Sequence, residues 1–129
     1  MATVTGILPA QAAAAAASVT TCGAFEPADG TGTGVNVAIL TPPAGFVTVT
    51  GVATNNVTFN FRQIRGGSVL STFGTVTLTA GANLVAEVPL VVPVTPVNLA
   101  ANDVIDVQMV QNGTGLAVAA GVIARTEIN

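Results

Sequence analysis

Apolar and polar side chains alternate with a period of two along much of the chain. In the segment 57–62, Val57, Phe59 and Phe61 share one side, and polar residues occupy the other. The segment 104–110 alternates in the same way. A period of two is that of a β-strand with one face packed and the other face wetter. The pattern therefore predicts a β-protein whose phenylalanines lie mostly in the core.

Turn residues divide the alternating segments into eight predicted strands joined by short loops. The predicted strands span residues 35–39, 46–53, 57–62, 69–78, 84–92, 94–99, 104–110 and 116–128. No connection is long enough for a helical crossover, so we expect antiparallel sheets. We predict an all-β, single-domain antiparallel β-sandwich, an eight-stranded jelly roll. An immunoglobulin-like sandwich is the alternative, although the cysteine and tryptophan of antibody domains are missing.

Glycine, proline and asparagine add local detail to this prediction. Gly74 falls inside a predicted strand and marks a β-bulge. Pro89 and Pro93 lack a backbone donor, which places the segment 84–92 at a sheet edge or at a crossing between sheets. Asn112-Gly113 suits the primed turns of short hairpins, so we expect the last two strands to form a hairpin.

Residues 1–24 differ from the rest because they contain a run of six alanines, Ala12 to Ala17. An isolated helix of this length is marginal in water, and Gln11 interrupts the span of about 20 apolar residues that a membrane requires. No basic residue precedes Arg62, so we expect no secretory signal. We predict an N-terminal arm at 1–24, ordered by whatever it lies against, and a β-sandwich domain at 25–129. A disordered tail is the alternative. If the arm prediction holds, deleting it should leave the domain folded.

The segment 27–34, PADGTGTG, is predicted to be a loop from its composition. Its glycines could cradle an anion, but a phosphate loop of the Walker type requires a lysine that the chain lacks. One aspartate among glycines supplies too few oxygen ligands for calcium. We therefore interpret the segment as a plain entry loop into the sandwich.

Charge is scarce in this chain. Only 7% of the residues are charged and half are apolar, whereas ordinary soluble domains contain about 25% charged residues. Few polar groups are available to cover a monomer's surface, so we expect apolar area to be buried between subunits. A large core alone is the alternative. Three arginines and no lysine are too few cations for nucleic-acid binding. The single Cys22 cannot form an internal disulfide and is interpreted as a small, buried or partly exposed thiol.

The residues that catalysis requires are largely missing. The chain has no histidine, which removes the general base of Ser-His-Asp and Cys-His arrangements. Asp103 and Asp106 could be imagined as the carboxylate pair of a glycosidase. However, one lies in a predicted turn and the other on the wetter face of a strand. One cysteine without imidazoles makes a poor metal site. We therefore expect no enzyme activity, no cofactor and no small-molecule substrate.

Two segments carry a resemblance to a known family. Residues 98–107, NLAANDVIDV, followed by 111–116, QNGTGL, resemble the late strands of capsid decoration proteins of tailed bacteriophages. The alanine- and threonine-rich segment before a glycine-rich entry is also similar. A related leucine–turn–Gly-Asp–strand pattern occurs in trimeric jelly rolls of the tumour-necrosis-factor and complement C1q type. This chain departs from that pattern by having Asn102 where glycine is usual.

The resemblance implies a homotrimer on the outer surface of the virion, made in the host cytoplasm and bound to the major capsid protein, where it stabilises the shell. Neither a membrane nor nucleic acid is expected as a partner. The candidate capsid contacts are Ile7, Leu8, Pro9 and Gln11 in the arm, together with Arg62 and Arg65. For the two arginines, ordinary solvated surface positions are the alternative.

A trimeric β-sandwich that binds receptors or glycans is the alternative function. Sugar recognition commonly stacks sugar rings on tryptophan or tyrosine, and the chain has neither. Its five phenylalanines fall mostly at positions predicted to be core.

Overall fold

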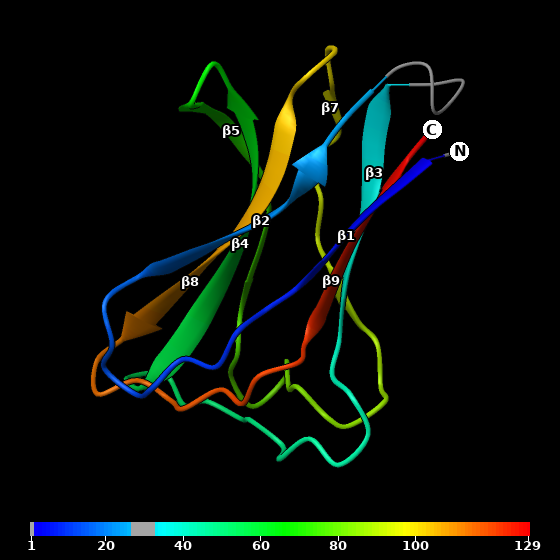
Figure 1. Ribbon diagram of the computed structural model, residues 1–129. Coiled ribbons are helices and arrows are strands. Elements are labelled where there is room, and N and C mark those ends of the chain that lie inside the picture. The colour runs from blue at the N-terminus through cyan, green and yellow to red at the C-terminus, as the bar shows by residue number, and fades with distance from the viewer. Residues whose placement is uncertain (1, 27–32) are drawn as a thin grey trace.

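Two antiparallel β-sheets face each other in the computed structural model, which describes residues 2–26 and 33–129 as nine strands (Figure 1). Sheet 1 contains, in spatial order, β1 (Ala2–Ile7), β9 (Ile123–Ile128), β3 (Gly34–Thr41) and β6 (Leu90–Val92), with the two-residue β7 (Val97–Asn98) also paired to β3. Sheet 2 contains β2 (Ser18–Ala24), β8 (Val104–Asn112), β4 (Asn56–Arg65) and β5 (Ser68–Thr77). None of the described residues forms a helix that is long and apolar enough to cross a membrane.

The strand pairs are nested, as in a jelly roll. The first strand pairs with the last (β1 with β9), the second with the next to last (β2 with β8), and then β3 pairs with β6 and β4 with β5. The folded ribbon is rolled so that β9 also pairs with β3, and β8 with β4. This order confirms the predicted all-β, single-domain antiparallel jelly roll. Eight of the nine strands form it, and β7 is an addition.

The predicted arm at 1–24 is wrong, because β1 and β2 are strands of the sandwich. Ala2 pairs with Ile128 at one end of β1, and β2 lies beside β8 in the other sheet. The two strands approach closely where the sheets meet, since a Cβ on Gly6 would lie 2.6 Å from the Sγ atom of Cys22. The proposed boundary between residues 24 and 25 therefore does not separate an arm from a domain.

Two later segments also differ from the prediction. Residues 46–53 form no strand, and their one β-bridge, between Val49 and Leu84, lies outside the named strands. Of the predicted strand 84–92, only β6 at its end is regular. As its prolines indicated, β6 is an edge strand. The number of jelly-roll strands was therefore correct, but β1 and β2 replace 46–53 and the short strand at 94–99.

Of the predictions for Gly74 and Asn112, the bulge is confirmed and the hairpin is wrong, whereas the turn between β4 and β5 is an added observation. Gly66 and Gly67 both have positive φ, which suits the two-residue turn between β4 and β5. The bulge at Gly74 is confirmed, because the register slips by one residue opposite Phe61. The expected hairpin at Asn112 is wrong: a turn forms there, but it connects β8 in sheet 2 to β9 in sheet 1.

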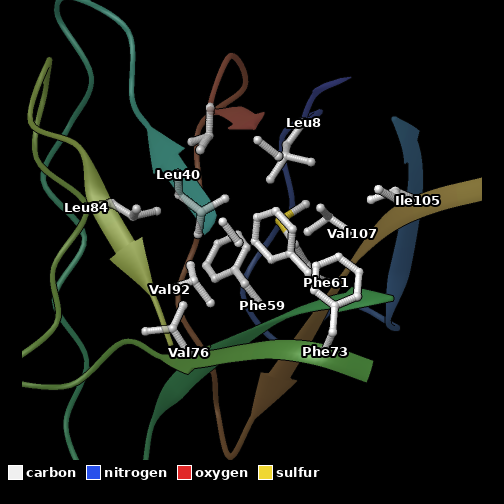
Figure 2. Close-up of a cluster of buried hydrophobic side chains, with 14 of the residues drawn as sticks. Leu8, Leu40, Phe59, Phe61, Phe73, Val76, Leu84, Val92, Ile105 and Val107 are labelled. Carbon is white, nitrogen blue, oxygen red and sulfur yellow. The ribbon is translucent and has the colours of Figure 1, made fainter. Parts of the chain in front are cut away.

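The core lies between the inward faces of the two sheets, and its centre is aromatic (Figure 2). Phe59 and Phe61 on β4 are fully buried, as their alternation predicted. Phe61 lies against Phe73 of β5, with ring centroids 6.2 Å apart and a tilted arrangement. Aliphatic residues from both sheets surround them, including Leu8, Leu40, Leu84, Val92, Ile105 and Val107.

The glycine-rich entry loop lies mostly outside the described residues, because positions 27–32 are not described. Its interpretation as a plain loop stays a prediction.

Candidate functional site

The four candidate contacts near the N-terminus divide into buried and exposed residues. Ile7 is 68% exposed, and Pro9 is also exposed. Leu8 is only 1% exposed and belongs to the core. Gln11 is 5% exposed. Leu8 and Gln11 are therefore structural residues in this fold, which corrects their assignment to a capsid-binding arm.

Gln11 is a buried polar anchor. Its Nε2 atom lies 3.1 Å from the carbonyl oxygen of Met109 on β8, and its Oε1 accepts a hydrogen bond of 2.8 Å from Gln111. Gln111 in turn donates to the carbonyl of Leu116 and accepts from the Leu116 N–H. The two glutamines thus tie the β1–β2 connection to the end of β8 and to the chain that follows it. Because buried amides must be paired to avoid a desolvation cost, both are committed to the fold.

Arg62 lies on the outer face of sheet 2 and forms a bidentate ion pair. Its Nε donates to Oδ1 of Asp106 at 2.7 Å, and its Nη2 donates to Oδ2 at 3.0 Å. The two side chains are cross-strand partners in β4 and β8, and both are largely buried. Asp106 thus lies on the outer face, as the alternation predicted, but Arg62 covers its carboxylate. Arg62 is not a solvated surface arginine, because it is already paired within the chain.

Arg65 forms a second bidentate pair, with Asp103. Its Nε and Nη2 atoms donate to the two carboxylate oxygens at 2.8 Å each. The Gln63 amide and the Ala100 N–H also donate to this carboxylate, each at 2.8 Å. Asp103 is buried, whereas the Arg65 side chain is about half exposed. This network connects the end of β4 to the turn before β8, so Arg65 is primarily a structural residue.

These hydrogen bonds set the charge state of Asp103. The Arg65 guanidinium holds the pKa of the Asp103 carboxyl well below its usual range, and the Ala100 and Gln63 donors act in the same direction against the effect of burial. Such a carboxylate is a weak base. Since Asp103 and Asp106 are each held by a different arginine, the pair is arranged to support the fold.

The depressed pKa of Asp103 predicts acid sensitivity. Because the pKa is lower in the folded state, the carboxylate stabilises the fold above its unfolded pKa of about 4, and this contribution is lost as the pH falls further through the folded pKa. We expect Asp103→Asn to be less stable than wild type at pH 7 and to lose less stability between pH 5 and pH 2. Urea unfolding midpoints across this range measure the effect.

A second variant separates the ion pair from the other donors. Arg65→Met removes the main cause of the low pKa and keeps the Gln63 and Ala100 donors. Its acid transition should therefore begin at a higher pH than that of wild type. Equal slopes for wild type and Asp103→Asn would contradict the role given to this carboxylate.

The outer face of sheet 2 carries polar side chains that hydrogen-bond to one another, together with Val19 and Val69, which are each 50% exposed. Asn60 lies near its centre, where its Nδ2 donates to Gln108 at 3.2 Å and its Oδ1 accepts from the Thr75 hydroxyl at 3.0 Å. The hydroxyls of Thr58 and Thr77 are 2.8 Å apart on neighbouring strands. Together with the Arg62 pair, these bonds form a ladder across β5, β4 and β8. This face has the character of a solvent-exposed surface.

The outer face of sheet 1 carries exposed apolar side chains beside the Arg125–Glu127 ion pair and the exposed Thr3 and Thr5. Ile7 on β1 faces Ile123 on β9, Ile123 faces Thr41 on β3, and Ile39 faces Val91 on β6. Ile7 is 68% exposed, Val91 66% and Ile123 38%. We call these five residues the sheet 1 patch. The patch crosses all four main strands of the sheet, and Arg125 lies beside it, opposite Ile39.

A shallow hollow of about 270 Å³ lies within this patch, bordered by Ile39, Thr41, Ile123, Pro89 and Arg125. Arg125 forms an exposed ion pair with Glu127 two residues along β9, at 2.7 Å. The rest of the hollow's border is uncharged. Exposed apolar area of this kind commonly marks a protein contact.

Aromatic side chains are not available on the surface to stack against a sugar. All five phenylalanines of the chain, at positions 25, 46, 59, 61 and 73, are buried. Phe25 and Phe46 lie outside the strands and are also buried, so the core extends beyond the strands. A glycan would therefore have to be held by polar contacts alone.

Cys22 is half-buried at the point where β1 and β2 meet. Burial, and to a smaller extent the nearby Asp106 carboxylate, raise the pKa of its thiol to about 11. The thiol is therefore protonated at neutral pH and is a poor nucleophile.

No family model, curated protein or solved structure matches the chain.

Proposed function

We propose that this chain is a structural virion protein: a capsid decoration protein that forms a homotrimer, binds the major capsid protein on the outside of a tailed-phage head, and stabilises the shell. The observation that carries the proposal is the exposed apolar sheet 1 patch on a jelly-roll sandwich, in which Ile7 and Val91 are 68% and 66% exposed. On the outer face of sheet 2, by comparison, most polar side chains bond one another.

The sheet 1 patch supports self-association. Three copies arranged around a threefold axis can bring this face of each subunit towards the others and remove its apolar side chains from water. Jelly rolls are a common architecture of capsid proteins. Low charge suits such an assembly, because few charged groups need to be desolvated at the interface.

Attachment to a shell also fits these properties. A rigid sandwich gives each trimer a fixed footprint, and three identical contacts on one lattice act together because the second and third contacts are intramolecular. The two ion-paired arginines at positions 62 and 65 support the fold in this account. We therefore place the shell contact on uncharged surface and the protein on the outer surface of the virion.

A charge placed in the sheet 1 patch tests the subunit interface. We expect Val91→Lys to weaken trimer formation by at least about 100-fold, because an unpaired ammonium buried in an apolar interface costs several kcal/mol. Sedimentation equilibrium over a concentration series measures the change. Thr75→Lys on the outer face of sheet 2 is the matched control and should leave the trimer unchanged. If Val91→Lys associates as tightly as wild type, the patch is not the interface.

The capsid role is tested in the phage that encodes the chain. Heads purified from a mutant lacking the gene should rupture at lower temperature or in milder osmotic shock than wild-type heads. Adding the purified protein should restore their resistance, and the protein should cosediment with them. Heads that neither bind the protein nor differ in resistance would contradict the proposal.

The glycan-binding alternative loses support from the burial of all five phenylalanines. Reproducible binding on a glycan array, combined with failure to bind heads, would favour that alternative over a shell stabiliser.

A further inference from the structure

Sheet 1 divides at the end that carries the β1–β2, β3–β4 and β8–β9 connections, at the bottom of Figure 1. The last pair between the central strands β9 and β3 joins Ile123 to Thr41. Beyond this pair the two chains separate. The segment before β9 stays paired with the segment after β1, and the segment after β3 stays bonded to the segment before β6. A groove of about 600 Å³ lies between the two halves, bordered by residues 10–12 and 116–119 on one side and 47–50 on the other.

Each side of the groove is an extended segment that is paired only on its far edge. Val118 exchanges two backbone hydrogen bonds with Gln11, and Val49 exchanges two with Leu84. In an antiparallel pair, the N–H and C=O groups of a residue point to one side and those of its neighbours point to the opposite side. The backbone groups of the residues flanking Val118 and Val49 therefore point away from these partners, towards the groove that they border.

Four residues supply these free backbone groups: Ala117 and Ala119 on one side, and Thr48 and Thr50 on the other. All four are exposed, and within residues 2–26 and 33–129 none of their backbone groups has a protein hydrogen-bond partner. The groove is thus the place of a missing strand: both of its walls offer open β-edges, and open edges are the usual template for adding a strand.

The side chains of the groove favour a narrow range of occupants. No charged residue borders it, and alanines on one wall allow a backbone to approach closely. Gln11, its one amide side chain, is already engaged by Gln111 and Met109. Apart from the hydroxyls of Thr48 and Thr50, the polar groups left in the groove are backbone groups, which suit another backbone. Each wall supplies four consecutive residues, which matches about four residues of an extended chain rising about 3.3 Å per residue.

We propose that this groove binds an extended, uncharged segment of a partner protein, which adds as a β-strand between Ala117–Ala119 and Thr48–Thr50 and completes sheet 1. Backbone hydrogen bonds to both walls provide the binding energy, and the alanine wall selects small apolar side chains. If the proposed function is correct, the segment belongs to the major capsid protein, and only this identification of the partner rests on that function.

A blocked, uncharged pentapeptide that alternates threonine with valine and alanine is the probe, used with the full-length protein and without capsids. We expect saturating peptide to slow amide hydrogen exchange of Thr48, Thr50, Ala117 and Ala119 by at least about tenfold, because these amides become paired. The same peptide with N-methylated backbone nitrogens keeps its side chains and loses its donors, so it should give no protection.

Filling the groove is the second arm of the test. Ala117→Trp should weaken peptide binding by at least about tenfold, whereas Ala13→Trp, at an exposed alanine outside the groove, should not. Equal binding of the N-methylated peptide, or no protection by either peptide, overturns the proposal. Protection of the four amides in peptide-free trimers also overturns it, because a second copy then occupies the groove. Peptide binding by a protein that fails to bind phage heads leaves the strand-addition site standing and contradicts only the capsid function.

Discussion

Deleting residues 2–24 is expected to abolish folding. The deletion removes β1, an edge strand of sheet 1, and β2, an edge strand of sheet 2. It also removes Leu8 from the core and Gln11 from the network that joins the β1–β2 connection to β8. Truncating one buried leucine typically costs about 2–5 kcal/mol, and a whole domain is stable by only about 5–15 kcal/mol. The loss of two strands exceeds that margin.

Circular dichroism and the chemical-shift dispersion of a proton–nitrogen correlation spectrum measure this outcome. A matched control changes Ala12, Ala13 and Ala16 to serine, because these residues are exposed on the connection between the two strands. The serine variant should unfold cooperatively, like wild type. A truncated protein that retained dispersed signals and cooperative unfolding would show that residues 2–24 are an arm after all.

Replacing Phe61 with alanine is expected to destabilise the protein by about 3–5 kcal/mol. The side chain is fully buried and its ring lies against that of Phe73. The variant therefore loses apolar burial, leaves a cavity between the sheets and removes an aromatic pair. Denaturant unfolding at fixed protein concentration measures the free energy of unfolding, and the fixed concentration keeps any contribution from association constant.

Val52→Ala is the control for this substitution, because Val52 is 58% exposed on the β3–β4 connection. Its effect should stay within about 0.5 kcal/mol. A loss of less than about 1 kcal/mol for Phe61→Ala would mean that the centre of the core is not where the alternation places it.

The central strands were predictable because burial on one face imposes a strict period of two. β4 and β8 carry three core residues each at alternating positions, and both were identified from the sequence. The edge strand β1 gives a weaker signal. Its inward residues are small (Ala2, Val4 and Gly6), since β1 must approach β2 closely where the sheets meet. Small inward residues do not produce a hydrophobic alternation.

The segment 46–53 was predicted to be a strand but forms none. It is rich in β-branched residues, and β propensity reports how a side chain fits a half-buried pleated surface. Here the segment has a β-bridge only at Val49, because sheet 1 has divided at this level, and its other backbone bonds, at Phe46 and Val52, close local turns. The predicted strand at 46–53 was therefore wrong, because the absence of a neighbouring strand is a tertiary feature that local propensity does not report.

The functional surfaces were harder to anticipate than the fold. Arg62 and Arg65 looked like free surface cations because their carboxylate partners lie about 40 positions later in the sequence, on β8 and in the turn before it. The sheet 1 patch is formed by β1, β9, β3 and β6, which are far apart along the chain. Ile39 and Thr41 are half-buried on the outward side of β3, but the partners that make the patch follow only from the jelly-roll order.

The molar mass of the purified protein in dilute solution tests the central claim most directly, since the capsid proposal requires the sheet 1 patch to be covered by sister subunits. Light scattering coupled to size-exclusion chromatography at micromolar concentration should give three times the 12.6 kDa mass of one chain. The mass should fall to that of a single chain for Val91→Lys. A wild-type protein that elutes with the mass of one chain under these conditions would contradict the account.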